Sequence, residues 1–539
     1  MVTKYRFNKL LFLSIIPALV IMIGCKNIKK QSDTGPVVSF EKNVEEILYR
    51  PDFHFTPKAN WMNDPNGMFY LNGKYHLYFQ YYPDGNVWGP MHWGHAISED
   101  LITWNEQPIA LYPDEKGYIF SGGAIVDHNN TSGFGKNGIV PIVAFFTYHN
   151  MDGEKEGTLD FQTQAIAYSL DEGMTWKKYE GNPVIPNPGI KDFRDPKVIW
   201  DSPNNKWILS LAAGDKIMFY SSPNLIEWEF ESEFGEGVGA HGGVWECPDL
   251  FPIKVEDNEE LKWVLLVSIN PGGPNGGSAT QYFVGDFNGK RFTLDKSFNN
   301  ELISNEAIWL DYGRDNYAGV TWSNIPKTDG RKLFIGWMSN WDYARDVPTE
   351  TWRSSMTAPR ELKLVNVNGN YRLESLPITE LNNYVSNTMY QDFLIKSKNK
   401  DIIITKKFNT SSLNIQFKMN DLKSEIYTFR FQNKEGDTLE IGLNNIENYF
   451  FIDRRKSGQV NFSEKFAPQI SKANSNKALN ALNIQILLDK TSIEVFYNDG
   501  ETVMTELFFP NNPLDTFSII SKDKDLKIID LKIQEFQFN

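Results

Sequence analysis

The segment Ser98-Glu99-Asp100-Leu101-Ile102-Thr103-Trp104 decides the fold, because variants of it recur at residues 169–176 and, in a degraded form, at residues 221–228. Each copy follows a strand-like run and ends on a Trp. Ser and Asp at such positions usually cap the backbone of a turn, so we interpret the three copies as structural hairpin turns. Repetition on this scale indicates one supersecondary unit per repeat, and here that unit is all-β.

The sequence around these turns, from about residue 51 to 375, consists of short strand-like runs separated by Gly, Pro, Asn and Asp. Residues 74–81, 142–148 and 262–268 are examples, and no long helical periodicity competes with them. The second copy of the repeat also resembles the Asp-box turn of β-propeller blades. We therefore expect a β-propeller in residues 51–375.

The pattern changes at about residue 385, where the strands alternate more strictly and Lys and Asn become more frequent. Residues 412–418 and 492–497 illustrate this alternation, and Asn498-Asp499-Gly500 is a strong hairpin signal. The sequence therefore predicts a second domain, a β-sandwich, in residues 376–539.

The first residues are typical of an export signal, since positive charges precede an apolar run at residues 10–23. That run is too short to be read as a membrane span. It ends at Met22-Ile23-Gly24-Cys25, which resembles a bacterial lipobox; a plain signal peptide with a chance Cys is the alternative. We predict a lipoprotein signal peptide at residues 1–24, lipidation of Cys25 and a tether at residues 25–50.

No Asp follows Cys25, and residues 26–32 lack acidic side chains. This pattern resembles an outer-membrane lipoprotein of a Gram-negative cell, and we expect it to face the periplasm. The chain has two cysteines, so removal of the signal peptide and lipidation of Cys25 would leave Cys247 as a free thiol with no intrachain disulfide.

Composition limits the classes of function. A length of 539 residues exceeds one ordinary hydrophobic core and predicts two domains. The net charge of -14 makes a nucleic-acid partner unlikely, because phosphate backbones bind basic surfaces. Aromatic residues make up 14% of the chain, which suits strands and sugar-stacking surfaces. His92 and His95 lack the helical spacing of a zinc site, so we predict no metal.

Three short segments carry carboxylates in unusual settings. Asp64 precedes Pro in a turn-like heptad at residues 61–67, where the alternative is a surface turn. Asp195 follows Arg194, which can keep the carboxylate ionised; an ordinary ion pair is the alternative. Glu246 lies between Trp245 and Cys247, which could desolvate it and raise its pKa; the alternative is an exposed strand end. Together they provide the two carboxylates that glycosidic hydrolysis requires.

The heptad with Asp64, the triplet at residues 194–196 and the pair Glu246-Cys247, in this order, resemble the three signatures of glycoside hydrolase family 32. That family includes invertases, inulinases and levanases. The resemblance continues into residues 451–455 and 492–500. It implies an all-β fold, a five-bladed β-propeller followed by a C-terminal β-sandwich, and it implies no cofactor.

The resemblance also implies roles. Asp64 would be the nucleophile, Asp195 would stabilise the transition state with Arg194, and Glu246 would be the acid/base. Configuration would be retained, with the carboxyl groups of Asp64 and Glu246 roughly 5–5.5 Å apart. The residues implied in the fructose pocket are Asn63, Gln80, Trp88, Ser121 and Arg194. Trp337 is the preferred sugar platform, ahead of Trp341, because it matches the family pattern more closely.

Residues 270–278 and 336–349 resemble bacterial and fungal fructanases more than plant invertases. We therefore expect an exo-acting β-fructosidase on levan or inulin, with sucrose as a further substrate. An endo-levanase is the alternative enzyme. A catalytically inactive fructan-binding lipoprotein and an inverting propeller hydrolase for arabinan or xylan are alternatives of other kinds.

Overall fold

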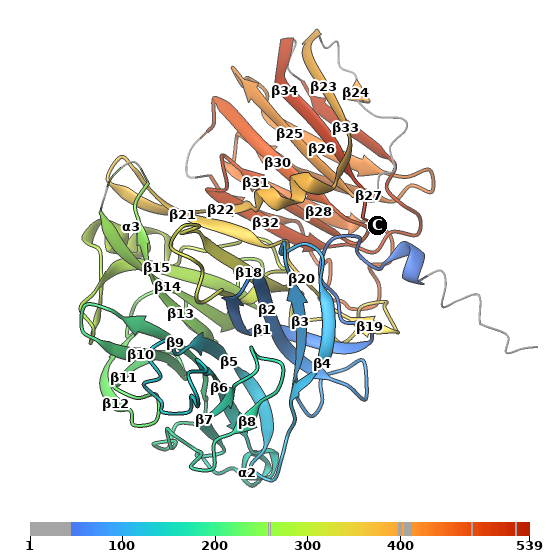
Figure 1. The fold of residues 1–539 in the computed structure, drawn as a ribbon. Coiled ribbons are helices and arrows are strands. Elements are labelled where there is room, and N and C mark those ends of the chain that lie inside the picture. Colours follow the sequence, from blue (N-terminus) through green and yellow to red (C-terminus); the bar gives the residue numbers. More distant parts are fainter. Residues whose placement is uncertain are drawn as a thin grey trace, which may run out of the picture.

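The computed structural model describes residues 45–538 apart from 257, 259, 397–401, 404–411, 476–477 and 523–524. The predicted signal peptide, Cys25 and most of the predicted tether lie outside the described residues. In the described part, strands form a ring of sheets and, beside it, a pair of stacked sheets (Figure 1). None of the helices described there has the length and apolar character that a membrane span requires.

Five sheets form the ring, and each is one blade of a propeller. Blade 1 contains β1 (Asn60–Leu71), β2 (Lys74–Tyr82), β3 (His92–Ser98) and β4 (Asn105–Leu111), with β19 (Trp352–Arg353) beside β1. Blade 2 contains β5 (Tyr118–Val126), β6 (Ile142–His149), β7 (Gln162–Ser169) and β8 (Lys177–Lys178). Blade 3 contains β9 (Phe193–Asp201), β10 (Lys206–Ala213), β11 (Ile217–Ser222) and β12 (Glu229–Phe234). Blade 4 contains β13 (Val244–Lys254), β14 (Leu261–Asn270), β15 (Ala279–Phe287) and β16 (Phe292–Leu294). Blade 5 contains β17 (Tyr317–Thr321), β18 (Lys332–Met338), β20 (Ser355–Met356), β21 (Arg360–Val367) and β22 (Asn370–Pro377).

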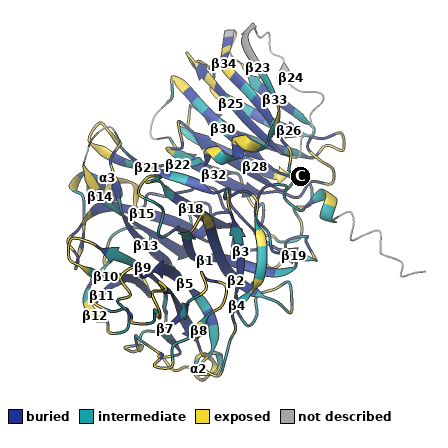
Figure 2. Cartoon of the chain, viewed as in Figure 1, coloured by how far each residue is buried: buried dark blue, intermediate teal, exposed yellow. Residues whose placement is uncertain are grey.

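The first strands of the five blades, β1, β5, β9, β13 and β17, contact one another in turn, and β17 contacts β1 to close the ring. β19 strengthens the closure because it returns after blade 5 and pairs in parallel with β1. Neighbouring blades cover both faces of each sheet, so strands such as β6 are buried along their whole length (Figure 2). The predicted five-bladed propeller is confirmed.

The three repeated turns have the structural role that the sequence predicts. Asp100 accepts hydrogen bonds from the backbone N–H groups of Ile102 and Thr103 at 2.9 and 2.8 Å. Asp171 accepts one from the N–H of Thr175 at 2.9 Å, and Asn224 takes the same position in the third copy. The Ser before each of these residues caps the same turn, which fixes the hairpins at the blade edges.

The second domain is a sandwich of two six-stranded sheets around one apolar core. One sheet contains β23 (Val385–Lys396), β34 (Asp525–Phe536), β25 (Leu413–Asn420), β30 (Ala481–Leu488), β31 (Ser492–Tyr497) and β32 (Thr502–Leu507). The other contains β24 (Ile402–Ile403), β33 (Thr516–Ser521), β26 (Ile426–Gln432), β27 (Thr438–Asn444), β28 (Tyr449–Lys456) and β29 (Ser471–Asn474). This confirms the predicted β-sandwich.

Short helices complete the structure: α2 (Met151–Glu156), α3 (Lys296–Asn305) and the 3-10 helix η1 (Thr379–Tyr384). η1 connects the last propeller strand to the first sandwich strand. Buried charges join the two domains, since Arg360 of blade 5 donates to Glu494 of β31 at 3.0 Å. Arg454 of β28 likewise donates to Asp315, which precedes blade 5, at 2.6 Å. Such fully paired buried charges fix the relative position of the domains.

Candidate active site

Each first strand of the propeller carries a β-bulge at the same level, where two residues lie opposite a single residue of the second strand. In blade 1, Asn63 and Asp64 lie opposite Gln80. The bulged pairs of the other blades are Phe120 and Ser121, Asp195 and Pro196, Cys247 and Pro248, and Ala318 and Gly319. A bulge redirects side chains, so the five repeats turn polar groups toward the propeller axis.

The bulges explain the Pro residues in the motifs. Pro196 and Pro248 lie within bulges, where the ladder hydrogen bond is already interrupted and a missing N–H costs little. Asp195 and Cys247 adopt left-handed backbone conformations, with φ of 66° and 46°. Non-glycine residues seldom adopt this conformation, and here it occurs at two positions that border the pocket carboxylates.

The bulges surround a pocket of about 230 Å³ at the propeller axis. Eight of the residues that the sequence predicts for the site line this pocket: Asn63, Asp64, Gln80, Trp88, Ser121, Arg194, Asp195 and Glu246. Phe120, His149, Glu154, Phe161, Gln162, Asp192 and Trp341 complete the wall. Side chains from blades 1 to 4 therefore converge, although they are distant in sequence.

Asp64 is held from both sides of its carboxylate. Ser121 donates to Oδ2 at 2.6 Å and Asn63 donates to Oδ1 at 2.9 Å. Trp61 in turn donates its indole N–H to the Asn63 side chain at 2.8 Å, which fixes the amide. Burial raises the pKa of Asp64, whereas the bonds from Ser121 and Asn63 favour the ionised form.

Cys247 lies between Asp195 and Asp64 and contacts both carboxylates. The Cys247 backbone N–H donates to Asp195 Oδ2 at 3.0 Å, and its Sγ lies 3.6 Å from the same oxygen and 3.8 Å from Asp64 Oδ2. Burial and the negative charge of Asp64 raise the pKa of Asp195, and Arg194 opposes this. Burial beside these carboxylates also raises the pKa of the Cys247 thiol, so the sulfur stays protonated and can act as a donor.

Glu246 has two partners. Arg194 donates to Oε1 through Nη2 at 2.8 Å and through Nε at 3.1 Å, and the Tyr317 hydroxyl donates to Oε2. Enclosure in the pocket raises the pKa of Glu246 to about 7, although Arg194 acts in the opposite direction. The pKa of Glu246 therefore suits it to carry a proton near neutral pH.

Family models match almost the whole described chain. The model for the N-terminal domain of glycosyl hydrolases family 32 covers residues 54–377, and the model for the C-terminal domain of that family covers residues 380–535. The chain belongs to glycoside hydrolase family 32.

Individual relatives agree with this assignment. A levanase of Bacillus subtilis is 46% identical over 90% of this chain and 70% of its own length. An extracellular exo-inulinase of Aspergillus awamori is 40% identical over 86% of this chain and 90% of its own length.

Solved structures of relatives have the same fold. The crystal structure of the exo-inulinase from Aspergillus awamori has a TM-score of 0.79 at 33% identity and covers 91% of this chain and 98% of that chain. The β-fructofuranosidase of Schwanniomyces occidentalis, complexed with fructosyl-erythritol, has a TM-score of 0.81 at 34% identity and covers 92% of this chain and 98% of that one. The chain is therefore a glycoside hydrolase.

Burial raises the pKa of Glu246 and Arg194 lowers that of Asp195, as expected, but the contacts around these carboxylates in this family 32 chain differ in detail. Trp245 does not line the pocket, because its indole packs against Phe283 inside blade 4 as strand alternation requires. Arg194 does not form its closest contacts with Asp195, whose Oδ2 lies 4.0 Å from Nε. It binds Glu246 instead, and Asp192 at 2.7 Å.

The structure places Trp337, the expected sugar platform, behind the wall of the pocket. Trp337 is fully buried and donates its indole N–H to the carbonyl of Met62 at 3.2 Å. Trp341, which the sequence ranks second, lines the pocket and packs at 4.9 Å against Trp337 and at 5.9 Å against Trp61. Trp337 thus supports Trp341 from behind.

Sequence reasoning missed Tyr317, which begins β17 and donates to Glu246. It occupies the position immediately before the bulge of blade 5, as Glu246 does in blade 4 and Arg194 in blade 3. β17 itself contains no carboxylate or Pro, so its sequence lacks the signal that marked the first strands of blades 1, 3 and 4. Gln162, which accepts a hydrogen bond from the backbone N–H of Phe193 at 2.8 Å, begins β7 and was also missed.

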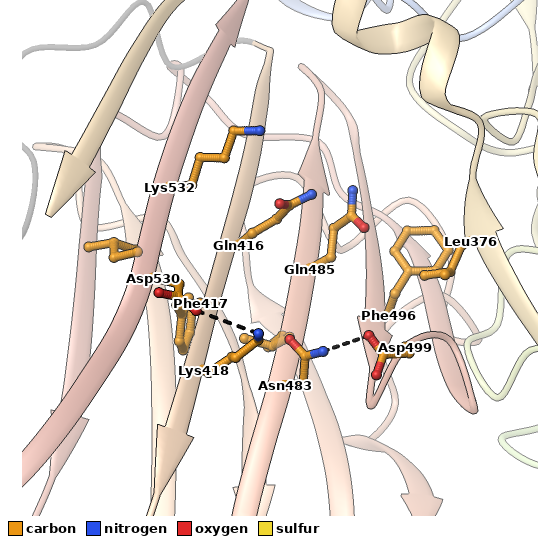
Figure 3. Close-up of a pocket in the computed structure, with 12 residues that line it drawn as sticks. Leu376, Gln416, Phe417, Lys418, Asn483, Gln485, Phe496, Asp499, Asp530 and Lys532 are labelled. Atoms are coloured by element: carbon orange, nitrogen blue, oxygen red, sulfur yellow. Dashed lines mark hydrogen bonds and ion pairs between the residues drawn. The ribbon is translucent and has the colours of Figure 1, made fainter. Parts of the chain in front are cut away.

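A larger hollow of about 750 Å³ lies on the sandwich and is lined by side chains of β25, β30 and β34 (Figure 3). Its carboxylates are separated and bonded to neighbours: Asp530 lies 3.5 Å from Lys418 Nζ, and Asp499 accepts from Asn483 at 2.6 Å. It lacks the converging carboxylates of the propeller pocket, so the propeller pocket is the candidate active site.

Proposed function

We propose that this glycoside hydrolase releases fructose from the ends of β-fructans by a double displacement that retains anomeric configuration. The observation that carries the proposal is one small pocket holding a hydrogen-bonded Asp64 and a Glu246 whose pKa is raised to about 7. The levanase and exo-inulinase relatives support levan and inulin as substrates. Sucrose, which presents the same terminal fructosyl unit, is expected to enter the pocket as well.

In the first step, Asp64 attacks the anomeric carbon of the terminal fructosyl unit. The bond from that carbon to the leaving oxygen breaks, and Glu246 gives its proton to that oxygen. A fructosyl ester of Asp64 forms and Glu246 becomes a carboxylate, which Arg194 and Tyr317 are placed to stabilise. Asp195 lies beside the nucleophile and is positioned to stabilise the positive charge that develops on the sugar ring.

In the second step, the Glu246 carboxylate takes a proton from water, and the resulting hydroxide oxygen attacks the anomeric carbon. The ester bond to Asp64 breaks, and β-fructose leaves with Glu246 protonated again. We infer that Asn63, Gln80, Trp88, Ser121 and Arg194 surround the fructosyl ring, because their side chains line the pocket. Trp341 replaces Trp337 as the inferred sugar platform.

Exo action is supported by the size of the pocket. A volume of about 230 Å³ is below the range of pockets that hold drug-sized ligands, and it suits one sugar ring better than a run of several. The competing function is an endo-levanase. Product analysis on levan separates the two, because an exo enzyme releases free fructose from the start, whereas an early ladder of oligosaccharides would contradict the proposal.

The decisive experiment measures fructose release from levan, inulin and sucrose by the natural chain and by Glu246→Ala. Loss of an acid/base group lowers the rate by about 10²–10⁴-fold. Glu236→Ala is a matched control, because Glu236 is exposed in a loop outside the pocket. Unchanged rates for Glu246→Ala would refute its assignment, and binding of fructan without hydrolysis by the natural chain would indicate a binding protein.

We also propose that residues 1–24 are removed, that Cys25 carries the lipid and that residues 25–50 tether the catalytic domain (51–375) and the sandwich (376–539) to the periplasmic face of an outer membrane. The lipobox-like sequence before Cys25 supports the anchor. Cys25→Ser should move the protein from the membrane fraction to the soluble fraction without changing fructose release. Removal of the natural protein by protease from intact cells would contradict the periplasmic orientation.

A further inference from the structure

A second cavity lies farther along the strands that form the catalytic pocket. Lys197 follows Asp195 by two residues on β9, and Asp249 follows Glu246 by three residues on β13. Because a strand advances about 3.3 Å per residue, the cavity begins roughly 7–10 Å beyond the carboxylates. It measures about 500 Å³, and residues from blades 2, 3, 4 and 5 line it.

Most charges in this cavity are balanced. Lys197 Nζ lies 3.7 Å from Asp249 Oδ2 and donates to the carbonyl of Thr321 at 2.6 Å. Arg331 binds Asp329 and Glu380, each at 2.7 Å. Together these two cations and three carboxylates carry one net negative charge.

Two lysines are not balanced. Within the part of the chain that the structure describes, neither Lys327 nor Lys332 has a carboxylate partner, and both line the cavity. The Lys332 ammonium lies 5.6 Å from the centre of the Phe251 ring; burial lowers its pKa, the charge of Asp249 opposes this, and Lys197 adds to the lowering. With Lys327 and Lys332 included, the charged groups at the cavity carry one net positive charge, in a chain whose net charge is -14.

The walls of the cavity are aromatic. Trp200 and Trp207 pack against each other with ring centroids 4.8 Å apart, and Trp322 contributes a third indole. The N–H of Trp207 is bonded to Thr131 at 2.8 Å and that of Trp322 to the carbonyl of His76 at 3.0 Å. Trp207 and Trp322 are 5% and 4% exposed, so the half-buried Trp200 provides the ring surface that a ligand can contact.

We propose that this cavity binds a small ring-shaped anion, a monosaccharide bearing one carboxylate or one phosphate. The anionic group binds Lys332, and the sugar ring packs against Trp200. The volume lies in the range of small-molecule sites. This site is separate from the fructose pocket, and its existence does not depend on the proposed hydrolysis.

Calorimetric titration of the full chain tests the site, with glucuronate, glucose 6-phosphate and neutral glucose as probes. We expect one or both anions to bind, glucose not to bind, and added salt to weaken binding. Lys332→Met should weaken anion binding by at least about tenfold, because a charge-assisted hydrogen bond is lost. Lys434→Met is the matched control, since Lys434 is exposed in a sandwich hairpin.

Two further measurements distinguish loss of the anion site from misfolding and from binding in the fructose pocket. Fructose release by Lys332→Met should equal that of the natural chain, which shows that the variant is folded. Saturating fructose should not displace the anion, because the two ligands occupy different cavities. The proposal is overturned if neither anion binds, if Lys332→Met binds the anion as well as the natural chain does, or if fructose displaces it. Binding of one anion alone supports the site and identifies whether it prefers carboxylate or phosphate.

Discussion

Arg194 donates two hydrogen bonds to Glu246, at 2.8 and 3.1 Å, and not to its sequence neighbour Asp195, from which its Nε is 4.0 Å away. The bulge in β9 separates the directions of these neighbouring side chains. The guanidinium therefore lowers the pKa of both carboxyl groups, but of the two only the acid/base Glu246 accepts its hydrogen bonds.

Arg194→Gln should shift the pH profile. In the natural chain, activity should fall as pH rises through about 7, because Glu246 must be protonated to assist the leaving group. Removal of the positive charge raises the pKa of Glu246 further, so the basic limb of kcat/KM should move to higher pH while the maximum rate falls. Arg455→Gln, at an exposed ion pair, is the control. A basic limb that stays in place would contradict the coupling.

Ser121→Ala should weaken the nucleophile. The 2.6 Å hydrogen bond favours ionised Asp64, so its loss raises the pKa of Asp64 and moves the acidic limb of kcat/KM to higher pH. A hydrogen bond to a charged group is worth about 1.5–3 kcal/mol, which corresponds to a loss of roughly tenfold or more in kcat/KM. Ser304→Ala on the surface of α3 is the control. An unchanged acidic limb would count against the role of Ser121.

Trp341→Ala and Trp337→Ala should separate binding from stability. Trp341 lines the pocket and is partly exposed, so its truncation should raise KM for fructo-oligosaccharides with little change in the unfolding temperature. Trp337 is fully buried, so its truncation should lower the free energy of unfolding by about 3–5 kcal/mol. Kinetics and thermal denaturation of both variants provide the comparison. The opposite pattern would restore Trp337 as the platform.

His54 should make the junction between the domains sensitive to alkaline pH. It lies 2.8 Å from both Asp489 and Glu494 of the sandwich, and these partners raise its pKa to about 9 despite the opposing effect of burial. Because the folded pKa exceeds the ordinary value of 6.5, the contribution is complete below pH 6.5 and is lost as pH rises through about 9.

The measurement compares denaturant unfolding of the natural chain and of His54→Gln at pH 6 and pH 10. The stability advantage of the natural chain should shrink by on the order of 3 kcal/mol between these conditions. His128→Gln is the control, since His128 lies on the surface and bonds Asn324. A constant difference between the natural chain and His54→Gln across this range would exclude a charged His54.

The sequence by itself determined the all-β class, the repeated turns and the three carboxylates. Those features are local: a Ser and an Asp cap a turn within a few residues, and Asp64, Asp195 and Glu246 stand in short motifs. In two of these motifs, Pro196 and Pro248 mark interrupted strand pairing.

Only the tertiary structure decided which neighbours those carboxylates have. A one-residue bulge reverses the side-chain alternation of a strand, so sequence adjacency to Asp195 did not reveal that Arg194 binds Glu246. Tyr317 and Trp341 reach the site from blade 5, far along the chain, and no local pattern marks their direction. The pocket exists because five distant strands close into one ring, which is a property of the assembled fold.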